Sequence, residues 1–309
     1  MRIATFNVQN LRLRRMGDEL WLDGARDADL PEDAKAGAVE LDLLDRRLTA
    51  AVLGDIDADI VALQEVFDRE TLDHFHDRFL LPVGMLPYPH RICLPGNDGR
   101  GLDVALLSRH PVDEVQSHAA LTPADLDISG APNPDAPIFR RDCLMARIGR
   151  LTLFVCHFKA PYPDAAVAWP IRHLEALAVR RLIERRFPSG AEGYWLVLGD
   201  MNEPEMAISA DRSAIAPLAR AFAVDLMERL PALDRWTYRD PGSGRYSRPD
   251  VLLASPSLAR DWPEACPTPV RKGLGHEARV PHESQLAGVG HHRPHASDHA
   301  AVVIEFEGM

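Results

Sequence analysis

Short apolar runs bounded by polar turn residues recur along this chain, and each predicts a buried β-strand. The clearest run occupies residues 195–198 and ends at Gly199, after which Asp200 and Asn202 follow. A run of this length with a glycine at its end is typical of a core strand. Because alternate residues of a strand share a face, we expect Asp200 and Asn202 to point together at the strand's carboxyl end. A local turn made by the Asp and Asn side chains is the alternative.

Runs of the same kind predict strands at residues 2–7, 60–63, 90–94, 102–108, 112–118, 143–148, 151–156, 251–253 and 300–306. Apolar residues recur at helical spacing over residues 40–54 and 170–187, with Pro170 expected at the start of the second helix. Asp68 is expected to cap a helix that runs to about Leu80, and short helices are expected over 205–235. Hairpins and helical crossovers occur together without strict alternation, which predicts a mixed α/β fold with two sheets packed as a sandwich and covered by helices.

Two long excursions without sustained periodicity occupy residues 12–39 and 256–297, and we expect both to run over the surface and to set specificity. The second is rich in basic and histidine residues, namely Arg271, Lys272, His276, His282, His291, His292 and His295. A solvated loop is the favoured interpretation of these side chains, and binding of anions or of a transition metal is the alternative. A chain of 309 residues without repeats predicts a single domain over residues 1–309.

Composition narrows the class of protein. Nothing approaches the roughly 18 consecutive apolar residues of a membrane span, and residues 1–6 resemble a first strand rather than a signal peptide, so we expect a cytoplasmic protein without membrane insertion. The cysteines form no CxxC pair and are expected to be free thiols; they are Cys93, Cys143, Cys156 and Cys266. The net charge of −11 argues against broad non-specific binding of duplex DNA but allows a local basic cleft.

Polar side chains stand at the ends of many predicted strands. If these ends share one edge of the molecule, they form a single polar pit, whose members would be Asn7, Glu65, His157, Asp200, Asn202, Asp250, Asp298 and His299. Each residue alone has an ordinary explanation as a turn, a cap or a buried core side chain. Their repeated occurrence at strand ends is harder to attribute to turn chemistry and favours a functional site.

The motifs around these residues, taken in order, resemble the endonuclease/exonuclease/phosphatase superfamily. They are residues 5–11 (TFNVQNL), 63–66 (LQEV), 101–108 (GLDVALLS), 157–159 (HFK), 199–202 (GDMN), 249–252 (PDVL) and 297–299 (SDH). The superfamily includes deoxyribonucleases, abasic-site exonucleases, neutral sphingomyelinases and inositol polyphosphate 5-phosphatases. The resemblance implies a four-layered α/β sandwich, in which two mixed β-sheets pack face to face and are flanked by helices.

The resemblance also implies a divalent-metal centre, with Mg²⁺ as the expected ion and Mn²⁺ or Ca²⁺ as alternatives. Glu65 looks like the principal metal ligand, with Asn7 beside it as an oxygen donor or orienter. Asp298 would be a second metal ligand or a proton donor. Oxygen ligands of this kind suit a hard cation. By the same resemblance, Asp200 and Asn202 would orient and deprotonate the attacking water.

Further side chains are implied at the phosphate. His299 would pair with Asp250, which fixes the tautomer of the imidazole and supports a positive charge on it. His157 would touch the scissile phosphate, because the deoxyribonuclease and sphingomyelinase branches carry histidine there. The candidate phosphate clamps are Arg141, Lys159 and Arg100, the last from a glycine-rich turn that is also explained as a tight hairpin.

Two departures from the abasic-site enzymes affect the expected substrate. Gln9 stands where those enzymes have an acidic residue, and His157 stands where they have tyrosine, which moves the interpretation away from base-excision repair. The favoured hypothesis is a metal-dependent hydrolase of phosphodiesters, with a nuclease acting on DNA or RNA as its leading version. The alternatives are a phosphomonoesterase or phospholipase-like hydrolase of a small or lipid phosphate, and a non-catalytic scaffold that binds phosphate. No protein partner is predicted.

Overall fold

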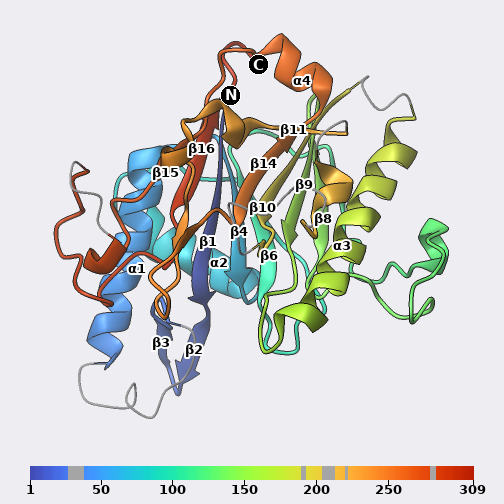
Figure 1. The fold of residues 1–309 in the computed structure, drawn as a ribbon. Coiled ribbons are helices and arrows are strands. Elements are labelled where there is room, and N and C mark those ends of the chain that lie inside the picture. Colours follow the sequence, from blue (N-terminus) through green and yellow to red (C-terminus); the bar gives the residue numbers. More distant parts are fainter. Residues whose placement is uncertain (27–37, 189–192, 204–212, 220–221, 279–282) are drawn as a thin grey trace.

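Two six-stranded sheets lie at the centre of the protein, with helices on their outer faces (Figure 1). This computed structural model describes residues 1–26, 38–188, 193–203, 213–219, 222–278 and 283–309. His282 and parts of both the first excursion and the predicted 205–235 helices lie outside the described residues. The arrangement confirms the predicted mixed α/β fold.

The first sheet places the amino-terminal strand between the last strand and β4. Its order is β15-β16-β1-β4-β6-β5, and its members are β1 (Arg2–Leu11), β4 (Ile60–Val66), β5 (His90–Cys93), β6 (Asp103–Ser108), β15 (Thr268–Val270) and β16 (Ala301–Glu305). β1 runs parallel to β4 and antiparallel to β16. Strands covered on both faces need apolar residues on both, which explains the continuous apolar runs in the sequence.

The second sheet is built around the strand that ends at Asp200. Its order is β11-β14-β10-β9-β8-β7, and its members are β7 (Glu114–Gln116), β8 (Cys143–Ile148), β9 (Leu151–His157), β10 (Tyr194–Asp200), β11 (Val224–Asp225) and β14 (Asp250–Ala254). β10 lies between parallel β9 and antiparallel β14. The register therefore sets Asp200 opposite His157 on one side and opposite Asp250 on the other.

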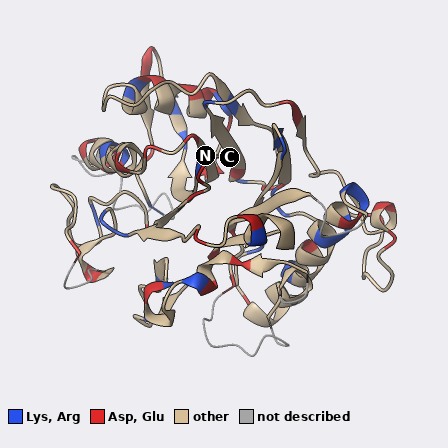
Figure 2. Ribbon diagram, turned by 90° about the horizontal axis from the view of Figure 1, so that it is seen from above, with Lys and Arg blue, Asp and Glu red and all other residues tan. Residues whose placement is uncertain are grey.

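Charged residues lie mainly on helices and loops, and the strands are mostly free of them (Figure 2). Basic and acidic positions are interspersed around the molecule in this view. Within the described residues, no helix is both long enough and apolar enough to cross a membrane. The cysteines are free thiols, as expected, with Cys266 exposed and the other three buried.

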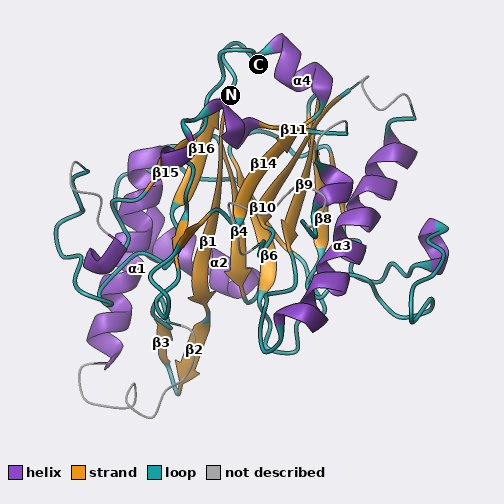
Figure 3. Ribbon diagram, viewed as in Figure 1, coloured by secondary structure: helices purple, strands orange, loops and turns teal. Residues whose placement is uncertain are grey.

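Four layers follow from which face of each sheet is covered (Figure 3). Ile3 of β1 packs between the sheets with Leu153 and Leu198 of the second sheet. Its neighbour Ala4 points the other way, into a core shared with Val52 of α1 (Ala38–Ile56) and with residues of α2 (Arg69–Phe75). The outer face of the second sheet packs on α3 (Ala165–Arg186). Successive side chains of a strand point to opposite faces of the sheet, so β1 contributes residues to two different cores.

The helix predictions need one correction. α2 begins as predicted, because the Asp68 side chain accepts the N–H of Thr71 at 2.7 Å, and a π-helical turn, η2 (His76–Leu80), continues it. Pro170, however, lies inside α3 rather than at its start. The helix begins five residues earlier because the Asp164 side chain accepts the N–H of Ala166 at 2.8 Å and caps it there.

Both excursions carry more regular structure than expected. The first contains a hairpin of β2 (Leu13–Met16) and β3 (Glu19–Leu22). The second contains α4 (Pro256–Asp261), the sheet strand β15 and the single-turn helix η7 (His276–Ala278). β15 is only three residues long and pairs with β16, so its apolar content was too small to reveal it. The remaining short elements are η3 (Ala124–Leu126), η4 (Ala216–Leu218), η5 (Leu226–Arg229), η6 (Ala232–Asp234), β12 (Tyr238–Arg239) and β13 (Tyr246–Ser247).

Candidate active site

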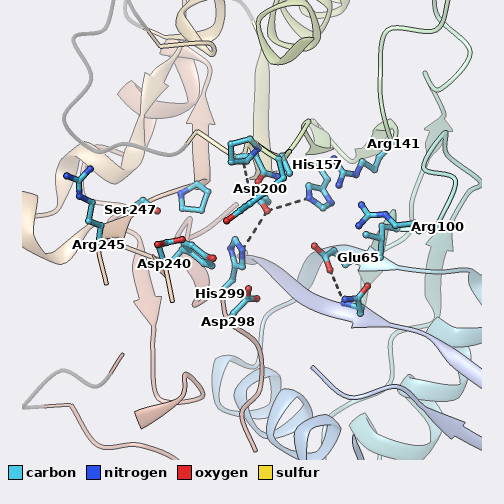
Figure 4. A pocket seen from close by; sticks show the side chains of 18 of the residues that line it. Glu65, Arg100, Arg141, His157, Asp200, Asp240, Arg245, Ser247, Asp298 and His299 are labelled. Carbon is cyan, nitrogen blue, oxygen red and sulfur yellow. Dashed lines mark hydrogen bonds and ion pairs between the residues drawn. The ribbon is translucent and has the colours of Figure 1, made fainter. Parts of the chain in front are cut away.

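The polar strand ends open onto one cavity of about 500 Å³ (Figure 4). Eight of the site residues singled out in the sequence line it: Glu65, Arg100, Arg141, His157, Asp200, Asn202, Asp298 and His299. Asn7 and Asp250 are buried behind this lining, and each bonds a side chain of the lining. The strand ends of both sheets therefore do meet at one place.

β10 ends at Asp200 with a sharp turn. Asp200 Oδ1 accepts the backbone N–H of Asn202 at 2.8 Å, and Asn202 has a left-handed φ of 50°. The side-chain amide of Asn202 donates to the carbonyl of Phe158 at 3.0 Å. Because of this turn, the expectation that Asp200 and Asn202 share one strand face is wrong, yet the turn leaves both side chains lining the cavity.

The Asp200 carboxylate is only 2% exposed and is surrounded by nitrogen atoms. Its Oδ2 accepts from Asn7 Nδ2 at 3.0 Å and lies 3.5 Å from His157 Nε2 and 3.8 Å from His299 Nε2. Burial raises the pKa of Asp200 to about 6, while the nearby His299 acts in the opposite direction. A carboxylate of this pKa is ionised at neutral pH and still basic enough to take a proton.

His299 carries a positive charge at the cavity wall. Its Nδ1 lies 2.9 Å from Asp250 Oδ2, which also accepts the hydroxyl of Thr237 at 2.6 Å. Burial lowers the pKa of His299, but the carboxylates of Asp250, Asp298 and Asp200 outweigh burial and hold that pKa well above its usual value. The imidazolium is therefore fixed between carboxylates and oriented by Asp250.

His157 differs from His299 in charge. Burial, reinforced by the positive charges of Arg141, His299 and Arg100, holds the pKa of His157 well below its usual value. Its Nε2 faces Asp200, and its buried Nδ1 has no hydrogen-bond partner among the described residues. A neutral ring at the cavity wall can donate or accept a single hydrogen bond toward a bound ligand.

Several residues around Glu65 have strained, left-handed backbone conformations. Gln9, Asn10 and Glu65 have left-handed φ values of 48°, 55° and 67°, and the pairing of β4 with both its neighbours shifts register beside them. Bulges of this kind change the direction of side chains at the ends of a sheet. Strained φ values persist where contacts with the surrounding structure stabilise them. The Glu65 carboxylate accepts from Asn7 Nδ2 at 3.2 Å and from the N–H of Asn10 at 2.9 Å.

The donor atoms around the cavity fit a divalent cation. Glu65 and Asp298 both line it, and carboxylate oxygens suit a hard ion such as Mg²⁺ or Mn²⁺. Asn7 accepts the N–H of Gln9 on its own oxygen at 3.0 Å and donates to two carboxylates, so here it orients them. The ligand atoms of Asp200, Asp250 and His299 also lie within 4.8 Å of one another, but a protonated imidazole has no lone pair to offer a cation, so this group fits one less well than Glu65 and Asp298 do.

Two arginines border the cavity beside His157 and Glu65 (Figure 4). Arg141 is 4% exposed, and its Nε lies 3.2 Å from Asp98 Oδ2 while its Nη1 donates to the carbonyl of Phe158. Arg100 Nη2 lies 3.0 Å from the same carboxylate oxygen. Asp98 therefore aligns both guanidinium groups at the cavity.

Lys159 is not brought into the cavity. Its ammonium group donates to the carbonyl of Ala160 at 2.8 Å and to that of Tyr162, so it ties down its own loop. A long flexible side chain can fold back on backbone carbonyls as readily as it can reach a ligand, and no sequence pattern distinguishes the two. We do not retain Lys159 as a phosphate clamp.

Sequence reasoning assigned no role to several residues around the site. Thr237 bonds Asp250, and the ring of Tyr238 packs on the ring of His299 at a centroid distance of 4.9 Å. Asn10 holds Glu65 through its backbone N–H. Tyr238 belongs to β12, which is two residues long, and a strand this short leaves no periodic signal. Only its sequence position, just ahead of the Asp250 motif, could have drawn attention to it.

Comparison with known proteins gives a consistent result. Residues 4–299 match the model of the Endonuclease/Exonuclease/phosphatase family. No curated protein sequence matches the chain. Among solved structures it is similar to an AP endonuclease from Archaeoglobus fulgidus, with 16% identity over 99% of both chains and a TM-score of 0.56. It is also similar to truncated TDP2 from Caenorhabditis elegans, with 15% identity over 98% of this chain and 96% of that chain and a TM-score of 0.56.

A third similar structure is a mannosyl-6-phosphatase from Bacteroides thetaiotaomicron, with 15% identity over 99% of this chain and 98% of that chain and a TM-score of 0.56. Identities at this level show a shared fold, and they confirm the sandwich expected from the sequence. The family match covers nearly the whole chain and confirms the resemblance carried by the ordered motifs. The chain belongs to the Endonuclease/Exonuclease/phosphatase family, a family of divalent-metal-dependent phosphoesterase hydrolases.

Proposed function

We propose that this protein cleaves a phosphodiester bond by metal-assisted attack of a water molecule. The observation that carries the proposal is the Asp200 carboxylate, whose pKa is raised to about 6 and which faces a cavity lined also by His299, Arg100 and Arg141. A divalent cation held by Glu65 and Asp298, such as Mg²⁺ or Mn²⁺, would neutralise charge on the phosphate. A weak base beside an array of positive groups is what such a reaction requires.

Asp200 and Asn202 are the proposed water-positioning pair. Asp200 takes the proton as the water oxygen bonds to phosphorus and the ester oxygen leaves from the opposite side. Asn7 donates to Asp200 at 3.0 Å and to Glu65 at 3.2 Å, and so it fixes the base relative to the cation ligand. The side-chain N–H of Asn202 donates to the carbonyl of Phe158, and its amide oxygen would accept a hydrogen bond from the water.

The positive groups are proposed to bind the phosphate oxygens. His299, kept protonated and oriented by Asp250, stabilises the charge that develops in the transition state. Arg141 and Arg100, aligned by Asp98, hold the phosphate, and the neutral His157 adds one hydrogen bond. These contacts orient the phosphorus for in-line attack.

A nucleic acid is the leading substrate. Tyr162 is 73% exposed at the cavity, and Tyr238 lines it together with Arg245 and Arg100. Aromatic faces that alternate with arginines beside a phosphate site are typical of proteins that bind single-stranded DNA or RNA, because bases stack on the rings while the cations contact the backbone. We therefore favour a nuclease.

A small or lipid phosphate is the second candidate. The cavity of about 500 Å³ is within the range of small-molecule sites, which hold about 300–1,000 Å³. The net charge of −11 disfavours long polyanions. Asp240 and Ser243 also line the cavity and can bond sugar hydroxyl groups. These features favour a compact phosphomonoester or a lipid headgroup.

A screen for hydrolysis in Mg²⁺ distinguishes these candidates. Its substrates are plasmid DNA, single-stranded RNA, bis-p-nitrophenyl phosphate, sphingomyelin and sugar phosphates, and His299→Ala is the blank. Cleavage of nucleic acid supports the nuclease, whereas release of phosphate only from small or lipid substrates supports the second candidate. No hydrolysis of any substrate by the wild-type protein would contradict both and favour a phosphate-binding scaffold.

A further inference from the structure

A separate group of metal-ligand side chains lies in the second excursion. Glu277 of η7 faces His291 and His292 across this excursion. Nδ1 of His292 lies 3.7 Å from Glu277 Oε1, and Nδ1 of His291 lies 4.0 Å from Glu277 Oε2. One ligand atom of each residue lies within 4.8 Å of the other two. None of the three residues lines the active-site cavity.

Backbone hydrogen bonds hold this group in place. Glu277 Oε2 accepts the N–H of His292 at 2.9 Å, and the N–H of His276 donates to the carbonyl of Gly290 at 2.9 Å. His292 has a left-handed φ of 62°, and the rings of His291 and His292 stand at 87° to each other. Consecutive side chains of an extended chain point apart, so this turn is what brings both rings to one carboxylate.

The chain directly after the two histidines is fastened to helix α1. Arg293 donates to Asp45 at 2.7 Å and to Asp42 at 2.6 Å, and the N–H of His295 donates to Asp45 at 3.0 Å. The two histidine rings are 69% and 71% exposed, and the hydrogen bonds to α1 hold the backbone that follows them. They are therefore open to an ion from solvent while their backbone is already positioned.

We propose that Glu277, His291 and His292 bind a divalent transition-metal ion such as Zn²⁺, at a site distinct from the catalytic one. Two imidazole nitrogens and a carboxylate oxygen suit Zn²⁺ far better than Mg²⁺. Bonds of about 2.0–2.2 Å to a tetrahedral ion set its ligand atoms about 3.3–3.6 Å apart. The observed 3.7 and 4.0 Å separations run to two different oxygens of Glu277, and one ligand atom of each residue lies within 4.8 Å of the others. Rotation of the two exposed imidazoles would bring the three atoms into the required range, with a water molecule as the fourth ligand.

The bound ion would link η7 to residues 291 and 292. Asp298 and His299 of the active site follow shortly after in the sequence. An ion that binds only the folded chain stabilises it by mass action. The bound ion would therefore stabilise the folded arrangement of the segment that leads into the active site.

Calorimetric titration of the full chain with Zn²⁺ at pH 7.5, in excess Mg²⁺, tests the proposal. The variant is the double substitution His291→Ala and His292→Ala, and the control is His276→Ala, an exposed histidine of the same excursion outside the group. Wild type and control should bind one Zn²⁺ more than the double variant. Co²⁺ should give the visible absorption of a tetrahedral ion in wild type, and this absorption should be absent from the double variant.

A further measurement separates metal binding from a role in folding. All three proteins should melt at the same temperature in EDTA, since the altered rings are exposed. Equal Zn²⁺ stoichiometry and affinity in wild type and double variant would overturn the proposal and leave an exposed His–Glu ion pair. Equal loss of Zn²⁺ binding in the control would also overturn this choice of ligands.

Discussion

Replacing Gly199 by alanine should misplace the end of β10 and, with it, Asp200. Gly199 has a φ of +131°, which L side chains rarely adopt, and an added Cβ would lie 2.0 Å from the carbonyl oxygen of Cys156. That oxygen belongs to the backbone of β9, where Gly199 pairs with Cys156 and Asp200 pairs with His157. The carbonyl cannot turn away without breaking the ladder between the two strands.

The cost follows from the geometry. Ordinary contact begins at 3.4 Å, so the strands must separate by about 1.4 Å, the difference between 3.4 and 2.0 Å. An unfavourable φ costs about 1–3 kcal/mol, and overpacking costs about 1–3 kcal/mol more. The sum of about 2–6 kcal/mol is a large part of the roughly 5–15 kcal/mol that stabilises a typical domain. A shift of about 1 Å at a catalytic group costs about 100-fold in rate.

Thermal unfolding followed by circular dichroism, with turnover measured on the same samples, tests this prediction. Gly84→Ala is the matched control, because Gly84 also has a positive φ, +88°, but nothing lies within 4 Å of its added Cβ. Gly199→Ala should melt at least about 4 °C below wild type, and below the control as well. If Gly199→Ala melts and turns over like Gly84→Ala, close strand contact does not set the position of Asp200.

Three other outcomes are expected. Glu65→Gln should raise the Mg²⁺ concentration for half-maximal activity by about 10-fold or more, and EDTA should abolish wild-type activity until Mg²⁺ or Mn²⁺ is added; full activity in EDTA would remove the cation from the mechanism. Thr237→Val removes the hydroxyl 2.6 Å from Asp250 and should lower the unfolding free energy in urea by about 1–3 kcal/mol, so an unchanged value would contradict that role. Burial raises the pKa of Glu175 from 4.5 to about 7. The folded protein then keeps a proton that the unfolded chain releases, so the free energy of unfolding falls as pH rises from about 4.5 to 7. Glu175→Gln should reduce this fall by up to about 3 kcal/mol. Parallel plots of unfolding free energy against pH for the two proteins would refute the prediction.

The sequence located the core strands and their polar ends because burial and chain direction decide both. The run that ends at Gly199 is apolar because β10 is covered on both faces. Its end is abrupt because Asp200 caps the turn to Asn202. The same reasoning found the strand end at Glu65 and the helix cap at Asp68. Local pattern was less reliable at element boundaries, since Pro170 was expected at the start of the helix that Asp164 caps.

Predictions of the direction in which a side chain points were less accurate than predictions of strands. The left-handed backbone at Asn202 and Glu65 turns their side chains away from the simple alternation of a strand, and such φ values leave no mark in a hydrophobic pattern. The ammonium group of Lys159 donates to a loop carbonyl, and nothing in the sequence distinguishes this conformation from one that reaches the cavity. Tyr238 belongs to a two-residue strand that Thr237 directly precedes, and its bridge to His299 joins parts of the chain that are distant in sequence.

The most direct test of the proposed mechanism is the ratio of kcat/KM between Asp200→Asn and wild type, measured on the best substrate at saturating Mg²⁺. Asparagine keeps the size of the side chain and removes its basic oxygen. The account predicts a loss of about 100- to 10,000-fold, with the circular dichroism spectrum unchanged. A variant that folds and retains a near wild-type rate would contradict the role of Asp200 as the base.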